Sequence, residues 1–539
     1  MMASLRFSPR ICLERALSDL DEKMDNAPTL FLQLPTGYGK TSVTLSALLA
    51  SQSGNPFIGD RIIHVLPLRS IVQDIKMRIS NDLEKLGKSS EMIAAQSMGS
   101  PGSPFFAKRL VVTTLDTFSL NLFKLPAWEV TKEFRSGTSH FEVPRGFVYP
   151  GTVVFDEAHL FSLTESTRPL TILLTSMECL ATAGVPIIVM TATLPTVIRE
   201  YLARKMENRN SSPIAYSYSK GDDKQFEETS GKRCIATTFI DSSELVSTIL
   251  EVANRSDGRV LVVVNEIRRA IELAKSSVLA PFKPDLIHGG LVEFEKEKKI
   301  HDLLLDLSSK IVISTQVVEA GIDMKNISIL VSDLAPMDRL VQRVGRVARK
   351  GGRGEMFVVI RDEDLQGKGR IYDPALLKST KDIICKEDST IDWTLDIQGL
   401  VDKAYSNIDV EEMINPSLNQ ILCNIDEDVL CEAHDTMQLL KGMGSFVRDT
   451  ALVKAFAPPY ISDGRVRAGG FTSVESYKAK KIFLGNMKLV RESSVVSLPE
   501  KHGFLAKSDP LLFPLLLEGA GYDGIILDHY EPWIGYQIE

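Results

Sequence analysis

The chain alternates short apolar runs with segments of helical character, and this pattern constrains its fold more than any other feature. Residues 28–50 combine an apolar run, a glycine-containing loop and a helical run. Further apolar runs stand at 62–68, 109–115, 151–157 and 185–193, and the amphipathic stretches 71–86 and 167–183 separate several of them. Parallel strands are buried on both faces and joined by helices, so they read as continuous apolar runs between helical segments. The pattern therefore predicts a doubly wound parallel sheet.

A second series of the same kind follows a polar stretch. The segment 206–230 is polar and contains Gly, Pro, Ser and Asn, and we interpret its middle as a linker. The second series has apolar runs at 259–265, 310–315, 327–334 and 355–360, with a predicted helix at 266–275. The predicted fold class is therefore α/β, with two similar parallel sheets flanked by helices.

The length of the chain leaves room for more than these two blocks. With about 150 residues per domain, 539 residues predict three or four domains. We place the boundaries at 1–212, 213–375 and 376–539. The last part begins with a helical, acidic stretch at 391–440 and continues with a basic stretch at 464–491. We expect it to be a mixed, partly helical accessory domain.

Composition excludes several classes of protein. The net charge of 62 − 70 = −8 argues against a surface that is coated with nucleic acid throughout, although a narrow basic channel stays compatible with it. None of the six cysteines forms a CxxC pair, which favours free thiols in a reducing cytoplasm. No apolar run reaches the roughly 18 residues of a membrane span, and the first 20 residues are not a secretory signal. We expect a cytoplasmic protein without membrane contact.

The segment LPTGYGKT at 34–41 has the composition of a phosphate-binding loop. Glycines let the backbone N–H groups curl around phosphates, Lys40 reaches the β and γ phosphates, and the Thr41 hydroxyl binds Mg²⁺ at the start of a helix. The residues expected to hold the nucleotide here are Thr36, Gly37, Gly39, Lys40 and Thr41. The strict motif has Gly where this chain has Leu34, so the alternative is a structural glycine turn.

Two further motifs follow apolar runs of the first block. VVFDEAH at 153–159 places Asp156 to hold Mg²⁺ through water and Glu157 to polarise the attacking water. TATLP at 191–195 offers Thr191 and Thr193 as hydrogen-bonding partners of the acidic motif, so that they and His159 couple the nucleotide state to the rest of the block. The alternatives are a solvated acidic turn and an ordinary Thr-rich turn.

The second block carries cationic and polar residues that suit the same reaction. QRVGRVAR at 342–349 puts Gln342, Arg343, Arg346 and Arg349 at helical spacing. We predict that Arg346 and Arg349 are arginine fingers, that Gln342 orients water, and that the fingers act when the two blocks close on ATP. The alternative is a solvated arginine face.

ISTQVVEAGIDM at 313–324 also follows an apolar run of the second block. Thr315 and Gly321 suit contacts with a phosphate backbone. Asp323 suits contact with the nucleotide or with the finger helix.

In this order, the motifs LPTGYGKT, DEAH, TATLP, STQVVEAGIDM and QRVGRVAR resemble those of superfamily 2 helicases, which have tandem RecA-like domains. More narrowly, the chain is similar to the CRISPR-associated helicase of type I systems. That likeness rests on HVLPLRSIVQDI at 64–75, VVTTLDTF at 111–118, VVFDEAHLF at 153–161, SDLAPMDRLVQRVGRVAR at 332–349, YDPALLKST at 372–380 and FVRDTALV at 446–453.

The resemblance implies ATP- and Mg²⁺-dependent translocation, 3′ to 5′, on single-stranded DNA, and partnership with a CRISPR RNA-guided surveillance complex. By position in the motifs, the residues that line the DNA are Arg69, Ser70, Thr114, Asp116 and Thr315. Arg69 is also the best phosphate contact by its chemistry.

The sequence departs from the family in two places. The family reads adenine with a Gln after a Pro-Arg pair, whereas Pro9-Arg10 is followed here by Leu13. Many members also carry an N-terminal HD nuclease, whereas the 33 residues before LPTGYGKT contain no His. The dipeptides His301-Asp302 and His434-Asp435 have no companion His at metal-binding spacing. We therefore expect a helicase subunit that works with a separate HD nuclease subunit.

Other functions stay open at this stage. One is a general DNA-repair or RNA helicase, and another is a scaffold that binds ATP as a switch. For the basic stretch 464–491 we predict contact with DNA or a partner, and the alternative is a solvated basic surface.

Overall fold

The computed structural model describes residues 10–536 except for 23–27, 36, 55–57, 98–99, 137–139, 162–165, 210, 231–232, 308, 320–323, 325, 349–351, 368–370, 387–396, 428–435 and 437–451. The chain divides into two compact units. Unit 1 comprises Met1–Asp223, Ile408–Ala451 and Lys507–Gly521, and unit 2 comprises Lys224–Asn407, Leu452–Ala506 and Tyr522–Glu539.

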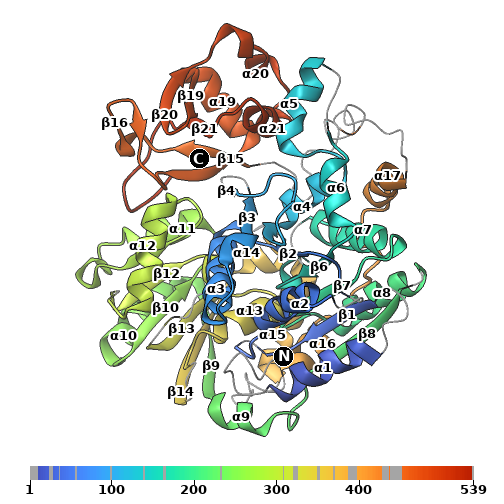
Figure 1. Cartoon of the computed structure of the whole chain (residues 1–539). Coiled ribbons are helices and arrows are strands. Elements are labelled where there is room, and N and C mark those ends of the chain that lie inside the picture. The colour runs from blue at the N-terminus through green and yellow to red at the C-terminus, as the bar shows by residue number, and fades with distance from the viewer. Residues whose placement is uncertain are drawn as a thin grey trace. The chain divides into compact units, whose positions relative to one another are not determined.

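Unit 1 is built on an eight-stranded sheet (Figure 1). In spatial order its strands are β4 (Ser100–Pro101), β3 (Ile93–Ser97), β5 (Leu110–Thr114), β2 (Ile62–Leu66), β6 (Thr152–Phe155), β7 (Ile187–Thr191), β1 (Pro28–Gln33) and β8 (Ser212–Ser217). All neighbours pair in parallel except β3 and β4. The unit's helices are α1 (Ile11–Glu22), α2 (Thr41–Gln52), α3 (Val72–Lys85), α4 (Leu115–Leu122), α5 (Ala127–Ser136), α6 (Val143–Val148), α7 (Arg168–Thr182), α8 (Thr196–Glu207), α17 (Pro416–Glu427) and α21 (Phe513–Gly519).

The linker that we expected in the middle of 206–230 is shorter than the polar stretch, and the boundary between the two units lies between Asp223 and Lys224. Ser212–Ser217 forms β8, which pairs in parallel with β1 along its whole length. Most residues of β8 are exposed or half-buried because it is the last strand of the sheet. An edge strand has one unpaired side and accepts polar side chains, so its sequence resembles that of a linker.

Unit 2 contains a six-stranded parallel sheet, as the second apolar series predicts. In spatial order the strands are β11 (Asp285–Ile287), β12 (Ile311–Ser314), β10 (Arg259–Val263), β13 (Ile327–Asp333), β14 (Gly352–Ile360) and β9 (Arg233–Asp241). The helices that belong with it are α9 (Lys224–Ser230), α10 (Leu245–Arg255), α11 (Ile267–Ala274), α12 (Glu293–Leu304), α13 (Met337–Val344), α14 (Asp362–Leu365), α15 (Pro374–Lys386) and α16 (Ile397–Ala404). Two parallel sheets flanked by helices confirm the predicted fold class.

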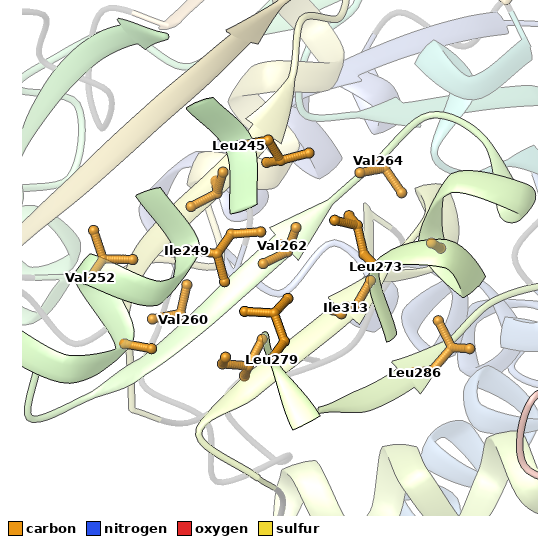
Figure 2. Close-up of a cluster of buried hydrophobic side chains, with 14 of the residues drawn as sticks. Leu245, Ile249, Val252, Val260, Val262, Val264, Leu273, Leu279, Leu286 and Ile313 are labelled. Atoms are coloured by element: carbon orange, nitrogen blue, oxygen red, sulfur yellow. The ribbon is translucent and has the colours of Figure 1, made fainter. Parts of the chain in front are cut away.

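The core of this sheet shows how the helices attach to it. Leu245, Ile249 and Val252 follow one another at intervals of four and three residues, so they share one face of α10. Figure 2 shows these side chains over Val260 and Val262 of β10. Each is at most 3% exposed, and burying an aliphatic side chain of this size stabilises the fold by roughly 1.5–3 kcal/mol.

A third, mixed sheet of seven strands also belongs to unit 2. Its strands in spatial order are β16 (Ile461–Ser462), β17 (Arg465–Val466), β20 (Ser494–Ser497), β19 (Lys488–Arg491), β21 (Gly524–Ile526), β15 (Leu452–Phe456) and β18 (Phe471–Glu475), and α19 (Ser476–Asn486) and α20 (Phe504–Lys507) accompany them. Only β15 and β21 pair in parallel. The expected mixed accessory part is confirmed. Residues 376–539 contribute to both units, and the domain boundaries drawn from the sequence stay predictions.

Within the described ranges, no helix combines the length and the apolar character that a membrane span requires. The four cysteines whose side chains are described, Cys12, Cys179, Cys385 and Cys423, are free thiols.

The C-terminal segment 530–536 is held against the second sheet's loops and α12. The Tyr536 N–H donates to the Gly290 carbonyl at 3.0 Å, and the Tyr530 hydroxyl accepts from the Val292 N–H at 3.0 Å. The buried His288 ring also takes part. The Gly290 N–H donates to its Nδ1 at 3.0 Å, so Nε2 carries the proton that it donates to the Ile534 carbonyl at 2.8 Å.

Burial lowers the pKa of His288 to about 4. The ordinary pKa of histidine is about 6.5, so between these values the unfolded chain binds a proton that the folded chain does not. We therefore expect His288 to cost the protein about 2 kcal/mol of unfolding free energy between about pH 7 and about pH 5. In His288→Gln that part of the loss should disappear. Urea unfolding at both pH values measures it, with the exposed His529→Gln as control. Equal losses in wild type and His288→Gln would contradict the assignment.

Candidate nucleotide and nucleic-acid sites

The predicted phosphate loop joins the end of β1 to the start of α2. Gly37 and Gly39 have φ angles of 83° and 96°, in the left-handed region that only glycine adopts readily. The Leu34 N–H donates to the Thr191 carbonyl at 3.0 Å, which fixes the first residue of the loop beside β7. Thr41 is the first residue of α2, as predicted. Thr36 lies outside the described residues.

The Lys40 side chain lies across the inside of this loop. Its exposed fraction is 8%, and Nζ donates to the carbonyls of Leu34 at 3.1 Å and Pro35 at 3.4 Å. The ammonium group is also close enough to Asp156 to stabilise its charge. A positive charge is therefore held at the centre of the loop, where phosphates would bind.

Asp156 directly follows β6 and is 4% exposed. Its Oδ1 accepts from the Glu157 N–H at 2.8 Å, and its Oδ2 lies 3.4 Å from Nε2 of His64. Burial raises the pKa of Asp156, but His64 and Lys40 outweigh burial and hold the pKa below its ordinary value. The carboxylate is ionised and, with the Thr41 hydroxyl, offers the oxygen ligands that Mg²⁺ prefers. The residues present therefore fit the expected cation.

Glu157 has a φ angle of 51°, which is uncommon for a residue with a side chain. Such backbone conformations concentrate at functional sites. Glu157 Oε2 lies 3.6 Å from His159 Nδ1, and its side chain is 25% exposed against 6% for Asp156. The two neighbouring carboxylates therefore differ in environment. One is buried beside cations, and the other is accessible to water.

The predicted coupling residues come together. His159 Nδ1 lies 3.1 Å from the Thr191 hydroxyl, which also accepts from the Thr193 N–H at 3.2 Å. In addition, Gln33 Nε2 donates to the Leu194 carbonyl at 2.9 Å. The acidic motif, the end of β7 and the end of β1 thus form one hydrogen-bonded group. Their role in coupling stays a prediction.

The predicted nucleic-acid residues of unit 1 follow the neighbouring strands β2 and β5. Arg69 and Ser70 lie in the 3₁₀ turn η2 (Arg69–Ile71), and the side chain of Ser70 lies outside the described residues. Thr114 ends β5, and Asp116 lies in the first turn of α4. The Thr114 hydroxyl accepts from the Thr117 N–H at 3.3 Å and so caps α4. Sheet order therefore gathers these residues at one edge, and their contact with DNA stays a prediction.

Arg343 has a structural place in unit 2. It is fully buried, and Nε donates to Glu319 Oε1 at 2.8 Å. Nη1 donates to the Ser332 hydroxyl and Nη2 to Asn265 Oδ1, both at 2.9 Å. The guanidinium therefore joins α13 to three other segments of the sheet's carboxyl edge.

Of the other predicted residues in the finger segment, the structure describes Gln342 and Arg346 but not Arg349. Arg346 donates through Nη2 to the Glu319 carbonyl. Gln342, Arg343 and Arg346 are 5%, 0% and 3% exposed, so the alternative of a solvated face is wrong for them. Arg349 lies outside the described residues, and the finger roles stay predictions.

Of the other predicted residues in unit 2, Thr315 directly follows β12 and is 2% exposed. Gly321 and Asp323 lie outside the described residues. The contacts predicted for these three residues stay untested.

Sequence reasoning missed the buried charges around Arg343. Arg339 lies 3.5 Å from Glu319 Oε2 and 3.5 Å from Asp338 Oδ2. The Tyr405 hydroxyl of the segment after α16 donates to Asp338 Oδ1 at 2.8 Å, and burial raises the pKa of Asp338. The sequence signal for this buried cluster was residue spacing, because Arg339 precedes Arg343 by four residues and therefore shares its helix face.

Tyr38 of the phosphate loop was also missed. It is fully buried, its hydroxyl donates to Asp223 Oδ2 at 2.6 Å, and the Arg10 guanidinium lies 5.4 Å from its ring centroid. Leu13, at the place where the family has Gln, is fully buried and has no polar side-chain atom. Tyr38 ties the loop to the segment after β8.

Several cations of the basic stretch 464–491 make contacts inside unit 2. The Arg467 guanidinium lies 3.9 Å from the Phe294 ring centroid, and that of Arg491 lies 4.3 Å from the Tyr522 centroid. Lys480 is buried and donates to the Leu505 carbonyl. The stretch is thus partly structural, and its contact with DNA or a partner stays a prediction.

In the part of the chain that the structure describes, no three His, Cys, Asp or Glu side chains are grouped so as to hold a metal ion. His434 and Asp435 lie outside that part.

Two family models match the chain. The DEAD/DEAH box helicase model matches residues 15–201, and the model for the C-terminal part of the CRISPR-associated nuclease/helicase Cas3 matches residues 256–352. The first match contains the phosphate loop and the acidic motif. The second contains the whole finger segment, residues 342–349.

Curated proteins with similar sequences carry related names. The CRISPR-associated helicase Cas3 of Thermoproteus tenax is 25% identical over 413 residues, which cover 72% of this chain and 65% of that protein. The CRISPR-associated nuclease/helicase Cas3 of Streptococcus thermophilus is 28% identical over 465 residues, which cover 74% of this chain and 48% of that protein. The chain thus spans about half to two thirds of the length of these relatives.

Solved structures share the fold. The crystal structure of T. fusca Cas3-ADP superposes with a TM-score of 0.64 at 15% identity, over 88% of this chain and 65% of that one. A chain of a CRISPR RNA-guided surveillance complex, pre-nicking, superposes with a TM-score of 0.59 at 16% identity, over 86% of this chain and 62% of that one. The two family models and the curated relatives therefore make this chain similar to DEAD/DEAH-box helicases and to Cas3, and the solved structures show that it shares their fold.

Proposed function

We propose that the chain is an ATP-dependent helicase of CRISPR interference that translocates 3′ to 5′ on single-stranded DNA. It unwinds target DNA for degradation by a separate HD nuclease subunit. The observation that carries the ATPase part is the buried, ionised Asp156 beside Lys40 of a loop with two left-handed glycines. The CRISPR part is supported by the names of the matched relatives.

In this proposal, the phosphate loop binds the triphosphate through its backbone N–H groups and Lys40. Thr41 and Asp156 hold Mg²⁺, which when bound neutralises phosphate charge and so favours attack at the γ-phosphate. Glu157 orients the attacking water and accepts its proton, which suits a carboxylate that is accessible to water. His159 and Thr191 keep the end of the acidic motif in place.

Unit 2 would complete the reaction with Arg346 and Arg349, whose planar cations suit the charge that develops in phosphoryl transfer. Gln342 would orient water. Gly321 and Asp323 would contact the nucleotide or the DNA backbone. Since these residues belong to a different unit from the phosphate loop, hydrolysis would depend on closure of the two units.

The DNA strand would contact Arg69, Ser70, Thr114, Asp116 and Thr315. In unit 1 these residues follow β2 and β5, while the nucleotide residues follow β6, β7 and β1 of the same sheet. Both sets lie at the carboxyl edge of parallel strands, where ligands of such sheets bind. A shift of β2 against β6 would therefore move the DNA-contacting residues relative to the nucleotide-binding residues.

Two partners belong to the proposal. A matched structure comes from a CRISPR RNA-guided surveillance complex, which supports such a complex as the recruiting partner. The T. tenax relative is named a helicase alone, which supports cleavage by a separate HD nuclease subunit. Cytoplasmic location stays a prediction.

Glu157→Gln should retain nucleotide binding and lose DNA-stimulated ATP turnover by about 10²–10⁴-fold, because only the proton-accepting carboxylate is removed. Steady-state ATPase assays and binding of a fluorescent ATP analogue measure the two quantities. Lys40→Ala is the companion variant and should lose turnover because the phosphate contact is lost. Loss of nucleotide binding in Glu157→Gln would contradict the role of Glu157. Equal hydrolysis by wild type and Lys40→Ala would contradict the site.

The polymer that stimulates turnover tests the substrate class. We expect single-stranded DNA to raise ATPase activity and RNA of the same sequence to raise it much less. The measurement is the ATPase rate against polymer concentration at fixed salt, since phosphate contacts make affinity salt-dependent. Strong stimulation by RNA but not by DNA would favour the alternative of an RNA helicase and reject the CRISPR role.

Substitution of Arg346 should affect ATP turnover, whereas substitution of Arg343 should affect the stability of the fold. Arg346→Lys should lower DNA-stimulated turnover by about 10³-fold, the lower end of the effect of an arginine finger, and leave nucleotide binding intact. Arg343→Met should instead lower the free energy of unfolding by roughly 3–5 kcal/mol, because it removes the cation that is hydrogen-bonded to the buried Glu319. Turnover assays and urea unfolding of both variants check this. Full activity of a stable Arg346→Lys would remove the finger assignment.

A further inference from the structure

His64 is a polar residue in the middle of an apolar strand. It is the third residue of β2, and that strand lies between β5 and β6 in the sheet. Its two cross-strand neighbours are Val112 and Val154. His64 is fully buried. Burying an imidazole in such a place costs free energy unless its nitrogens have polar partners.

Both ring nitrogens face groups of the nucleotide site. Nδ1 lies 2.8 Å from the Thr44 hydroxyl, and Thr44 lies on α2 three residues after Thr41. Nε2 lies 3.4 Å from Asp156 Oδ2. Thr44 is fully buried and Asp156 nearly so, which leaves the three side chains in contact without room for exchange with bulk water. The ring therefore joins the helix after the phosphate loop to the acidic motif from inside the sheet.

The chemistry of Asp156 and Thr44 indicates which nitrogen of the His64 ring donates a hydrogen bond and which accepts one. An ionised carboxylate only accepts hydrogen bonds, so the nitrogen that faces Asp156 carries a proton. The Thr44 hydroxyl, 2.8 Å away, can donate to the other nitrogen. Among the described residues, Nε2 has no well-aligned hydrogen-bond partner, and Asp156 is the acceptor that it faces.

Asp156 is oriented from two sides. The Glu157 N–H fixes Oδ1 at 2.8 Å, and the His64 ring stands beside Oδ2. Rotation of the carboxylate about its Cβ–Cγ bond would carry Oδ2 away from His64 and take away the acceptor that the buried Nε2 faces. Outer partners of this kind set the direction of a ligating carboxylate, and their loss typically lowers metal affinity by about 10–100-fold.

We propose that His64 is a positioning residue for Mg²⁺ binding, which holds the Asp156 carboxylate in its ligating orientation and is itself held by Thr44. The inference rests on the proposed ATPase function, because it concerns the cation that accompanies the nucleotide. It gives a role to His64, for which the motif analysis of the sequence proposed none. It also explains why β2 carries a polar side chain at the one position that faces both α2 and the end of β6.

The test compares three variants of the full chain. His64→Leu keeps an apolar volume in the strand and removes the donor. His64→Gln keeps a side-chain amide that can donate toward Asp156, and Thr44→Val removes the hydroxyl that holds the ring. The control is His529→Leu, which changes an exposed histidine far along the chain.

Two measurements are made on each variant. The first is binding of a fluorescent ATP analogue without divalent cation and across a Mg²⁺ titration, which needs no turnover. The second is the Mg²⁺ concentration for half-maximal DNA-stimulated ATPase activity. A structural role alone would lower both kinds of binding together, whereas a positioning role changes only the Mg²⁺ dependence.

In His64→Leu we expect the half-saturating Mg²⁺ concentration to rise by about 10–100-fold, with binding in the absence of Mg²⁺ unchanged. His64→Gln should recover most of this loss, and Thr44→Val should show a smaller rise. An unchanged Mg²⁺ dependence in folded His64→Leu would overturn the inference. If that variant does not fold, an unchanged Mg²⁺ dependence in Thr44→Val would overturn it. Absence of Mg²⁺-dependent nucleotide binding in wild type would instead count against the proposed function.

Discussion

The negatively charged Asp156 side chain is almost completely buried, and the candidate site of unit 1 depends on the groups that stabilise this buried charge. A buried ion costs several kcal/mol unless charges and hydrogen bonds around it compensate. The compensation comes from three places in the sequence, namely Lys40 of the phosphate loop, His64 of β2 and the backbone of Glu157. They meet because β1, β2 and β6 end at the same edge of one parallel sheet. Had the strand order been different, the same motifs would have been present without forming a site.

Unit 2 also buries charge at the carboxyl edge of its sheet, with a different consequence. Arg343 and Glu319 are both almost inaccessible, and Arg343 has hydrogen-bond partners around its whole guanidinium. A charge with that many partners is fixed in place and suits a structural role. Arg346 lies three residues further on and donates to a backbone carbonyl. A hydrogen bond to a neutral carbonyl is weaker than one to a carboxylate. The two arginines of one motif therefore suit different tasks.

The sequence was informative where structure and chemistry are local. Central strands such as β2, β10 and β13 were predictable because both faces are buried and their sequences are mostly apolar. The polar edge strand β8 and the two-residue strands β16 and β17 gave no such signal. Asp156, Glu157 and Lys40 were predictable because each motif follows its own strand. The roles of His64 and Arg343 were not, because their partners are distant in sequence and are brought near only by strand order.

Glu295 of α12 illustrates how such distant contacts decide the organisation of a whole unit. Its carboxylate is fully buried and accepts hydrogen bonds from the hydroxyls of Tyr460 and Tyr530 and from the N–H of Trp533. A carboxylate can only accept, so the donors must converge on it, and they come from two separate segments, one between β15 and β16 and one after β21. These bonds and the contacts of His288 attach the third sheet to the second within unit 2. In the proposed closure on ATP, the third sheet would therefore move together with the arginine segment of the same unit.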